Sequence, residues 1–186
     1  MKKILIQYKP FFTFLVKFFA SYLALIILYS TYLNQFDASR NELDSITKTV
    51  ASNVNEVLLL LNQDSSMYNM TTEPAVGMRF NGKIISRVVE GCNAISLMLL
   101  FMAFVIAFSS TLKKTSLYIG FGLILIYVMN ITRIALLNYA LYYYPEQRVL
   151  LHDILFPLVI YGIVFLLWVI WVLKFSNHAK KQNGTP

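Results

Sequence analysis

Four apolar stretches, each long enough to cross a lipid bilayer, most constrain how this chain can fold. They cover residues 11–33, 93–112, 115–137 and 154–175, and each reaches the roughly 20 residues that a hydrocarbon core of about 30 Å requires. Hydrophobic residues make up 58% of the chain, above the roughly 45–50% of a soluble domain. The sequence therefore predicts an all-α membrane protein, a four-transmembrane-helix bundle that forms a single membrane domain over residues 1–186.

Lysines mark one set of ends of these stretches. They lie around the start of the first stretch, in the short link that holds Lys113 and Lys114, and after the fourth stretch, whereas all nine acidic residues and every arginine lie on the opposite side. The positive-inside rule then predicts that both termini are cytoplasmic and that the segment 34–91 faces outside. The net charge of +7 comes without a basic stripe, so the expected partner is the lipid bilayer and not nucleic acid.

Two further elements are expected in the outer segment. Apolar residues recur at helical spacing over residues 42–61 and predict an amphipathic helix, with Ser39 or Asn41 as a candidate cap. That helix either lies on the outer leaflet or packs over the top of the bundle. Residues 76–89 predict a β-hairpin because Asn81-Gly82 is a strong turn signal. The hairpin either caps the bundle or offers a strand edge to an extended peptide.

Cys92 is the only cysteine, which excludes an internal disulfide and a cysteine-rich metal site. No metal or other cofactor is expected. Cys92 begins the second stretch, Asn130 and Arg133 lie on one helix face near the outer end of the third, and His152-Asp153 opens the fourth. The predicted topology therefore brings Cys92, Arg133 and His152 to the outer end of the bundle from three different helices.

These residue types suit nucleophilic catalysis. A cysteine attacks as its thiolate, which a helix N-terminus and a nearby cation both favour. A histidine serves as base or acid, and an arginine stabilises an oxyanion or holds a carboxylate. Glu90 or Asp153 is a candidate to orient His152 or to pair with Arg133. The structural alternative is that Cys92 is an inert small hydrophobe, that His152 is an interfacial polar residue and that Arg133 only links helices.

The order and local sequence of these residues resemble the exosortase/archaeosortase family. The resemblance covers roughly residues 85–175. It rests on Glu90-Gly-Cys-Asn-Ala-Ile95, Asn130-Ile-Thr-Arg133 and His152-Asp-Ile-Leu-Phe-Pro157. The first and last of these motifs look most like the exosortase F branch found in Bacteroidetes. The resemblance implies a membrane cysteine transpeptidase or protease in a bacterial inner membrane, with its active site facing the periplasm.

The same resemblance implies roles for individual residues. Cys92 is expected as the nucleophile, Arg133 as the transition-state stabiliser and His152 as the acid/base. Many members read Cys-Ser-Gly where this chain has Cys92-Asn93-Ala94. The supporting candidates are Glu90, Asn93, Asn130 and Asp153.

The resemblance also implies partners and a reaction. The substrates are surface proteins whose C-terminal sorting signal consists of a short recognition motif, a transmembrane helix and a basic tail, and a small membrane accessory protein is a further candidate partner. Cys92 would form a thioester that an acceptor nucleophile or water resolves. The alternative is a non-catalytic scaffold or accessory protein of a surface-sorting or polysaccharide-export system. Other intramembrane protease classes are disfavoured, since the sequence has no His-Glu-x-x-His, no Gly-x-Ser-x-Gly and no pair of intramembrane aspartates.

Overall fold

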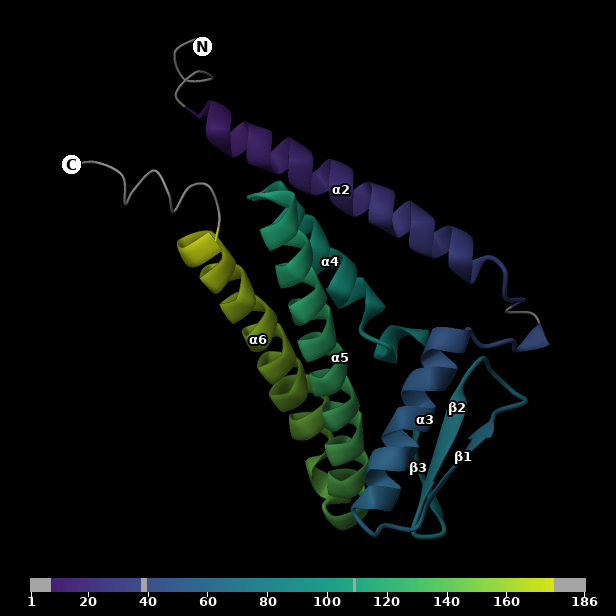
Figure 1. The fold of residues 1–186 in the computed structure, drawn as a ribbon. Helices are drawn as coiled ribbons and strands as arrows, with labels where there is room; N and C mark the ends of the chain where they lie inside the picture. The colour runs from purple at the N-terminus through teal and green to yellow at the C-terminus, as the bar shows by residue number, and fades with distance from the viewer. Residues whose placement is uncertain (1–7, 38–39, 109, 176–186) are drawn as a thin grey trace. The chain divides into compact units, whose positions relative to one another are not determined.

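The computed structural model describes residues 8–37, 40–108 and 110–175, and these residues are mostly helical (Figure 1). The chain divides into two compact units. Unit 1 comprises Met1–Thr31, Ser96–Ile124 and Ile163–Pro186, and unit 2 comprises Tyr32–Ile95 and Leu125–Gly162. The expectation of one domain over residues 1–186 stays a prediction. The lysines expected to mark both termini include some outside the described residues, namely Lys2, Lys3, Lys180 and Lys181.

Three helical segments of the described chain are long and apolar enough to cross a membrane. They are α2 (Lys9–Leu33), α5 (Leu112–Tyr143) and the segment Leu150–Phe175, in which α6 (Phe156–Ile170) lies between two π-helical stretches. These segments confirm a membrane protein of the all-α class. Their bounds contain the expected stretches 11–33, 115–137 and 154–175, because hydropathy identifies the apolar run and helix geometry then extends it into flanking polar residues.

The second expected span, 93–112, is much shorter as a helix. Helix α4 runs from Ile95 to Ala107, which is about 20 Å at 1.5 Å per residue, against a hydrocarbon core of about 30 Å. It cannot begin earlier as regular helix because Ala94 has a positive φ of 63°, and Phe108 is already in a turn. The length of α4 therefore does not establish a fourth span.

Aromatic side chains pack the described part of unit 1. Phe104 of α4 stacks on Trp168 of α6 with ring centroids 4.5 Å apart. The ring nitrogen of Trp171, a fully buried residue, donates a hydrogen bond to the carbonyl oxygen of Phe108 at 3.1 Å. By contrast, none of the residues of α2 is buried, as expected of a helix whose apolar surface faces lipid.

Unit 2 contains a three-stranded antiparallel sheet with the order β1-β2-β3. The strands are β1 (Ser65–Asn69), β2 (Val76–Phe80) and β3 (Lys83–Val88). The predicted hairpin is confirmed: Asn81 and Gly82 both have positive φ, 48° and 76°, as a two-residue type I′ turn requires. Strand β1 was not expected, since its sequence is polar. Strand β3 lies at a sheet edge, and peptide binding along that edge stays a prediction.

The predicted amphipathic helix is α3 (Ser45–Leu60). Its cap is Asp44, whose carboxylate accepts a hydrogen bond from the Thr47 amide at 2.9 Å. The expectation of Asn41 as the cap is therefore wrong, because Asn41 lies too far ahead of the first helical turn and its side-chain amide donates to the carbonyl oxygen of Thr71. The other expected candidate, Ser39, lies outside the described residues.

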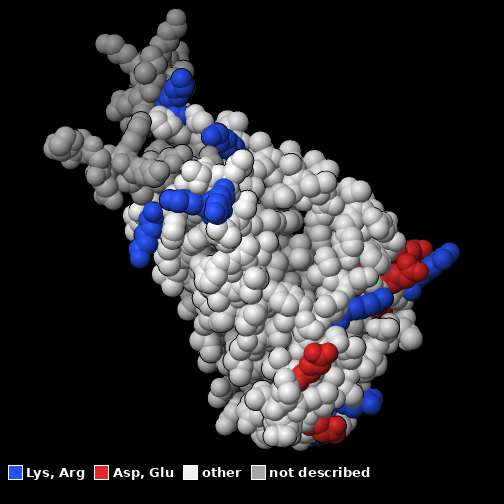
Figure 2. Space-filling model, viewed as in Figure 1, with Lys and Arg blue, Asp and Glu red and all other residues white. Residues whose placement is uncertain are grey.

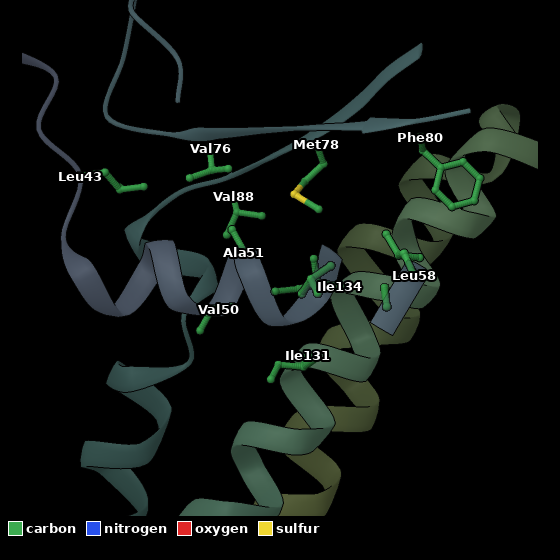
Figure 3. Packing of buried hydrophobic residues seen from close by; sticks show 12 residues of the cluster. Leu43, Val50, Ala51, Leu58, Val76, Met78, Phe80, Val88, Ile131 and Ile134 are labelled. Atoms are coloured by element: carbon green, nitrogen blue, oxygen red, sulfur yellow. The ribbon is translucent and has the colours of Figure 1, made fainter. Parts of the chain in front are cut away.

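The apolar face of α3 is buried within unit 2, not left for a lipid leaflet. Figure 3 shows side chains of α3, the sheet and α5 meeting in one cluster. Its helix α3 members include Val50, Ala51, Val54 and Leu58, all at most 1% exposed. The packing alternative for this helix is thus the one that the structure shows. The other members of the cluster are Leu43, Val76, Met78, Phe80, Val88, Ile131, Ile134 and Ala135.

Charge is unevenly divided between the units. Among the described residues, every charged side chain of unit 1 is a lysine, and all nine acidic residues of the chain belong to unit 2. In Figure 2 the lysines of unit 1 accordingly form a blue region without red. The charged residues of unit 1 that the structure describes are Lys9, Lys17, Lys113, Lys114 and Lys174.

Candidate active site

Cys92 lies in a tight turn between the sheet and α4. Strand β3 ends at Val88, a 3₁₀ turn covers Glu90–Cys92, and α4 begins only at Ile95. The Cys92 amide donates to the carbonyl oxygen of Val89 at 2.8 Å. Cys92 therefore precedes the helix and is not its first residue, which corrects the expected start of the second stretch. The correction removes the α4 helix dipole as a strong source of thiolate stabilisation, since that effect is confined to the first turn.

Two buried side-chain amides hold this turn. The Asn130 amide of α5 donates to the carbonyl oxygen of Cys92 at 2.8 Å. The Asn93 amide donates to the hydroxyl of Thr47 in α3 at 3.0 Å, while the Asn93 side-chain oxygen accepts from the Ile95 amide at 2.9 Å. Asn93 and Asn130 are each only 1% exposed. The Cys92 carbonyl and the residue that follows it are thus held by two different helices, α5 and α3.

Arg133 lies one turn beyond Asn130, on the same face of α5. Its side chain is partly buried, and its Nε atom is buried without a hydrogen-bond partner among the described residues. A buried donor without a partner costs about 1–3 kcal/mol. The side chain as a whole is only partly buried, so its terminal guanidinium N–H groups, and not the buried Nε, suit a carbonyl or carboxylate oxygen of a bound molecule.

His152 lies in the π-helical stretch Leu150–Leu155 that precedes α6. Its Nδ1 is 2.7 Å from Oδ1 of Asp153, and both side chains are exposed, at 54% and 61%. A contact of this kind can orient an imidazole, and that role of Asp153 stays a prediction. With Nδ1 directed at the carboxylate, Nε2 is the ring nitrogen left for proton exchange.

All seven candidate residues belong to unit 2. The structure joins Cys92 directly to Asn130, and it places Arg133 beside Asn130 on α5. His152 hydrogen bonds to Asp153 and not to Cys92 or Arg133. Its convergence on the thiol therefore stays a prediction. Glu90 is half-buried at the start of the 3₁₀ turn and accepts a backbone hydrogen bond from Asn93.

Sequence reasoning missed Thr47 as part of this site. Thr47 is fully buried and receives the Asn93 hydrogen bond. The available signal was a hydroxyl on the otherwise apolar face of the amphipathic helix, one turn before Val50. A buried hydroxyl needs a partner, but the sequence alone does not name it.

No group of three or more His, Cys, Asp and Glu side chains within the described residues is arranged to hold a metal ion.

The comparison with family models matches the model described as transmembrane exosortase to residues 7–174. Neither the curated proteins nor the solved structures compared with the chain give a match.

Proposed function

The chain belongs to the transmembrane exosortase family, and we propose from this that Cys92 is its nucleophile. Membership of this family supports the general function of a membrane-embedded sorting transpeptidase. The enzyme would cleave the C-terminal sorting signals of exported proteins through a Cys92 thioester. The observation that carries the proposal is the Asn130–Cys92 hydrogen bond, which ties the thiol-bearing turn to the helix that also carries Arg133.

The proposed reaction has two balanced halves. In the first, the Cys92 thiolate attacks the scissile carbonyl carbon, a C–S bond forms, and the carbonyl oxygen becomes an oxyanion that the Arg133 guanidinium stabilises. The C–N bond then breaks, and His152 donates its proton to the leaving amine, which departs with the transmembrane helix of the signal. In the second half, an acceptor nucleophile or water gives its proton to His152 and attacks the thioester carbonyl carbon, the C–S bond breaks, and Cys92 leaves as the thiolate.

The surroundings of Arg133 and His152 fit their proposed roles. The guanidinium of Arg133 is only partly buried and can donate to an oxyanion. Nδ1 of His152 lies 2.7 Å from Oδ1 of Asp153, the kind of contact by which a carboxylate orients the imidazole in catalytic triads. Catalytic contacts often tighten only when substrate binds, so the proposal requires His152 to reach the leaving amine in the complex.

Replacing Arg133 with Ala should slow alkylation of Cys92 by a membrane-permeant reagent. Equal alkylation rates in the variant and the unaltered protein would show that Arg133 does not activate the thiol.

We also propose the exosortase F branch, on the motifs Glu90-Gly-Cys-Asn-Ala-Ile95 and His152-Asp-Ile-Leu-Phe-Pro157. The proposed substrates carry a recognition motif, a transmembrane helix and a basic tail, and a small membrane protein is a candidate accessory partner. Exported proteins with such tails encoded beside this chain's gene would support the proposed substrates. Tails that lack the helix or the basic end would contradict it.

We further propose four spans in a bacterial inner membrane, with both termini cytoplasmic and Cys92 facing the periplasm. The argument is electrostatic: if α4 did not cross, Lys113 and Lys114 would lie on the same side as the acidic unit 2 segment, against the positive-inside rule. A Cys92→Ser, Lys113→Cys protein tests this with a membrane-impermeant thiol reagent. Labelling of Lys113→Cys from the periplasm in intact cells would refute the four-span topology.

The decisive experiment for the enzyme is replacement of the thiol. Cys92→Ala and Cys92→Ser proteins that accumulate normally should leave the sorting signals of surface proteins uncleaved in the native host. Ser96→Ala is a matched control, since Ser96 is an exposed hydroxyl in the first turn of α4. A labelled substrate should also form an adduct with the unaltered chain that hydroxylamine releases, as it does thioesters.

The competing function is a non-catalytic scaffold. One observation favours it: Cys92 is half-buried and packs against the hydrophobic cluster of unit 2, as an inert cysteine does. Unchanged processing in the Cys92→Ala protein, with no hydroxylamine-sensitive adduct, would support the scaffold function and exclude the proposed enzymatic function.

A further inference from the structure

A groove of about 420 Å³ lies between the beginning of α5 and the end of the last helical segment, within unit 1. Helix α5 lines it with Lys114, Leu117, Tyr118 and Phe121. These positions follow i, i+3, i+4 and i+7 spacing, so they form one continuous helix face. Lys114 is the first of them, and its ammonium group therefore marks one end of an otherwise apolar strip.

The other side of the groove is formed by the last helical segment, with Leu167, Ile170 and Phe175, and it contacts α5 directly. The Tyr118 hydroxyl donates a hydrogen bond to the carbonyl oxygen of Leu167 at 2.6 Å, and the Tyr118 ring lies 5.5 Å from the ring of Phe175. These contacts join the two helical segments that line the groove. Leu117 and Phe121 remain 66% and 58% exposed, so apolar surface of the lining is available to a bound chain.

The composition of the groove lining favours an amphiphilic molecule that carries one negative charge. Carbon atoms form nearly all of the surface, and among the described residues that line it Lys114 is the only charged one. Every described charged residue of unit 1 is a lysine, so the surroundings attract an anion. A transmembrane helix with a basic tail, such as a sorting signal, would meet repulsion here instead.

We propose that this groove binds an acyl chain of an anionic phospholipid, whose phosphate pairs with the ammonium group of Lys114. Basic pockets between transmembrane helices are known to hold such head groups. The volume lies within the roughly 300–1,000 Å³ of ligand pockets. This lipid site goes beyond the transpeptidase function and does not depend on Cys92.

Tryptophan fluorescence of the full chain in a bilayer tests the proposal. The chain has two tryptophans, so Trp168→Phe leaves Trp171, whose ring lies 4.8 Å from that of Tyr118. Brominated phosphatidylglycerol and brominated phosphatidylcholine are each added at the same small fraction to a phosphatidylcholine bilayer. We expect half-maximal quenching at an about fivefold lower fraction of the anionic lipid, as the ~1 kcal/mol of one lysine near an anionic surface predicts.

Two variants that each remove one positive charge distinguish binding in this groove from a general attraction between lysines and anionic lipid. Lys114→Gln should abolish the preference, whereas Lys113→Gln removes the same charge from a residue that does not line the groove and should keep it. Equal quenching by the two lipids in the unaltered groove would overturn the proposal, and so would equal losses in the two lysine variants. Relief of quenching by a peptide with a transmembrane helix and a basic tail would assign the groove to that helix instead.

Discussion

Removal of the Asn130 amide gives the sharpest test of how the Cys92 turn is held. Asn130→Ala deletes the donor to the Cys92 carbonyl oxygen without changing the thiol itself. Asn130 is 1% exposed, so water cannot easily replace the lost donor. The variant should therefore leave a buried carbonyl unsatisfied beside the proposed nucleophile.

The expected size of the effect follows from two estimates. Hydrogen bonds between membrane helices contribute about 0.6 kcal/mol on average and about 1.7 at most, while an unsatisfied buried group costs about 1–3 kcal/mol. We expect the free energy of unfolding to fall by about 1–2 kcal/mol. If the turn must be held for attack, substrate processing should fall further than stability explains, by about tenfold for each 1.4 kcal/mol of lost transition-state stabilisation.

Asn53→Ala is the matched control. The Asn53 amide of α3 donates to the hydroxyl of Tyr127 in α5 at 2.7 Å, a contact within the same unit that does not involve the turn. Both variants are compared by chemical unfolding in detergent, by the rate of Cys92 alkylation and by processing of a sorting substrate. Asn53→Ala should lose similar stability but keep the alkylation rate and the processing rate of the unaltered protein.

The comparison with Asn53→Ala also shows which results would contradict the predicted role of Asn130. Equal alkylation and processing in Asn130→Ala and Asn53→Ala, at equal stability, would show that Asn130 only stabilises unit 2. Asn130→Ala with unchanged stability would contradict the structural argument itself, since it would mean that the hydrogen bond to Cys92 is not formed.

Two further variants test packing at single positions. Thr47→Val keeps the shape of a fully buried residue but removes the acceptor of the Asn93 amide, so chemical unfolding should show a loss of about 1–3 kcal/mol; no loss would refute this contact. Gly122→Ala would place a Cβ against the ring of buried Phe101, so overpacking should cost about 1–3 kcal/mol. Gly120→Ala meets nothing within 4 Å and should be neutral or stabilising through helix propensity, and an equal loss in both glycine variants would contradict the packing between α4 and α5.

The sequence predicted best where the signal is local. Hydropathy identified α2, α5 and the segment around α6, and the Asn81-Gly82 pair located the hairpin turn. Apolar spacing identified α3 and most of its buried face. These features follow from residues that are neighbours along the chain, so a sequence window contains all of the relevant physics.

Prediction was weaker where competing local interactions decide the boundary. The apolar run 93–112 gave no sign that Ala94 adopts a positive φ and delays α4 to Ile95. Likewise, Ser39, Asn41 and Asp44 are all of types that cap helices, and only the folded backbone selects Asp44 as the cap. Strand β1 is polar and forms because β2 is available for pairing, which no pattern within β1 itself indicates.

The sequence by itself determined that this chain is a helical membrane protein, where its long helices and hairpin lie, and which residue types could perform cysteine chemistry. Only the tertiary structure decided that Asn130 holds the Cys92 carbonyl oxygen and that Thr47 holds Asn93. The reason is that hydropathy and turn signals act through neighbouring residues, whereas a buried hydrogen bond forms between groups distant in sequence. Such groups find their partners only after α3, the sheet and α5 have packed together.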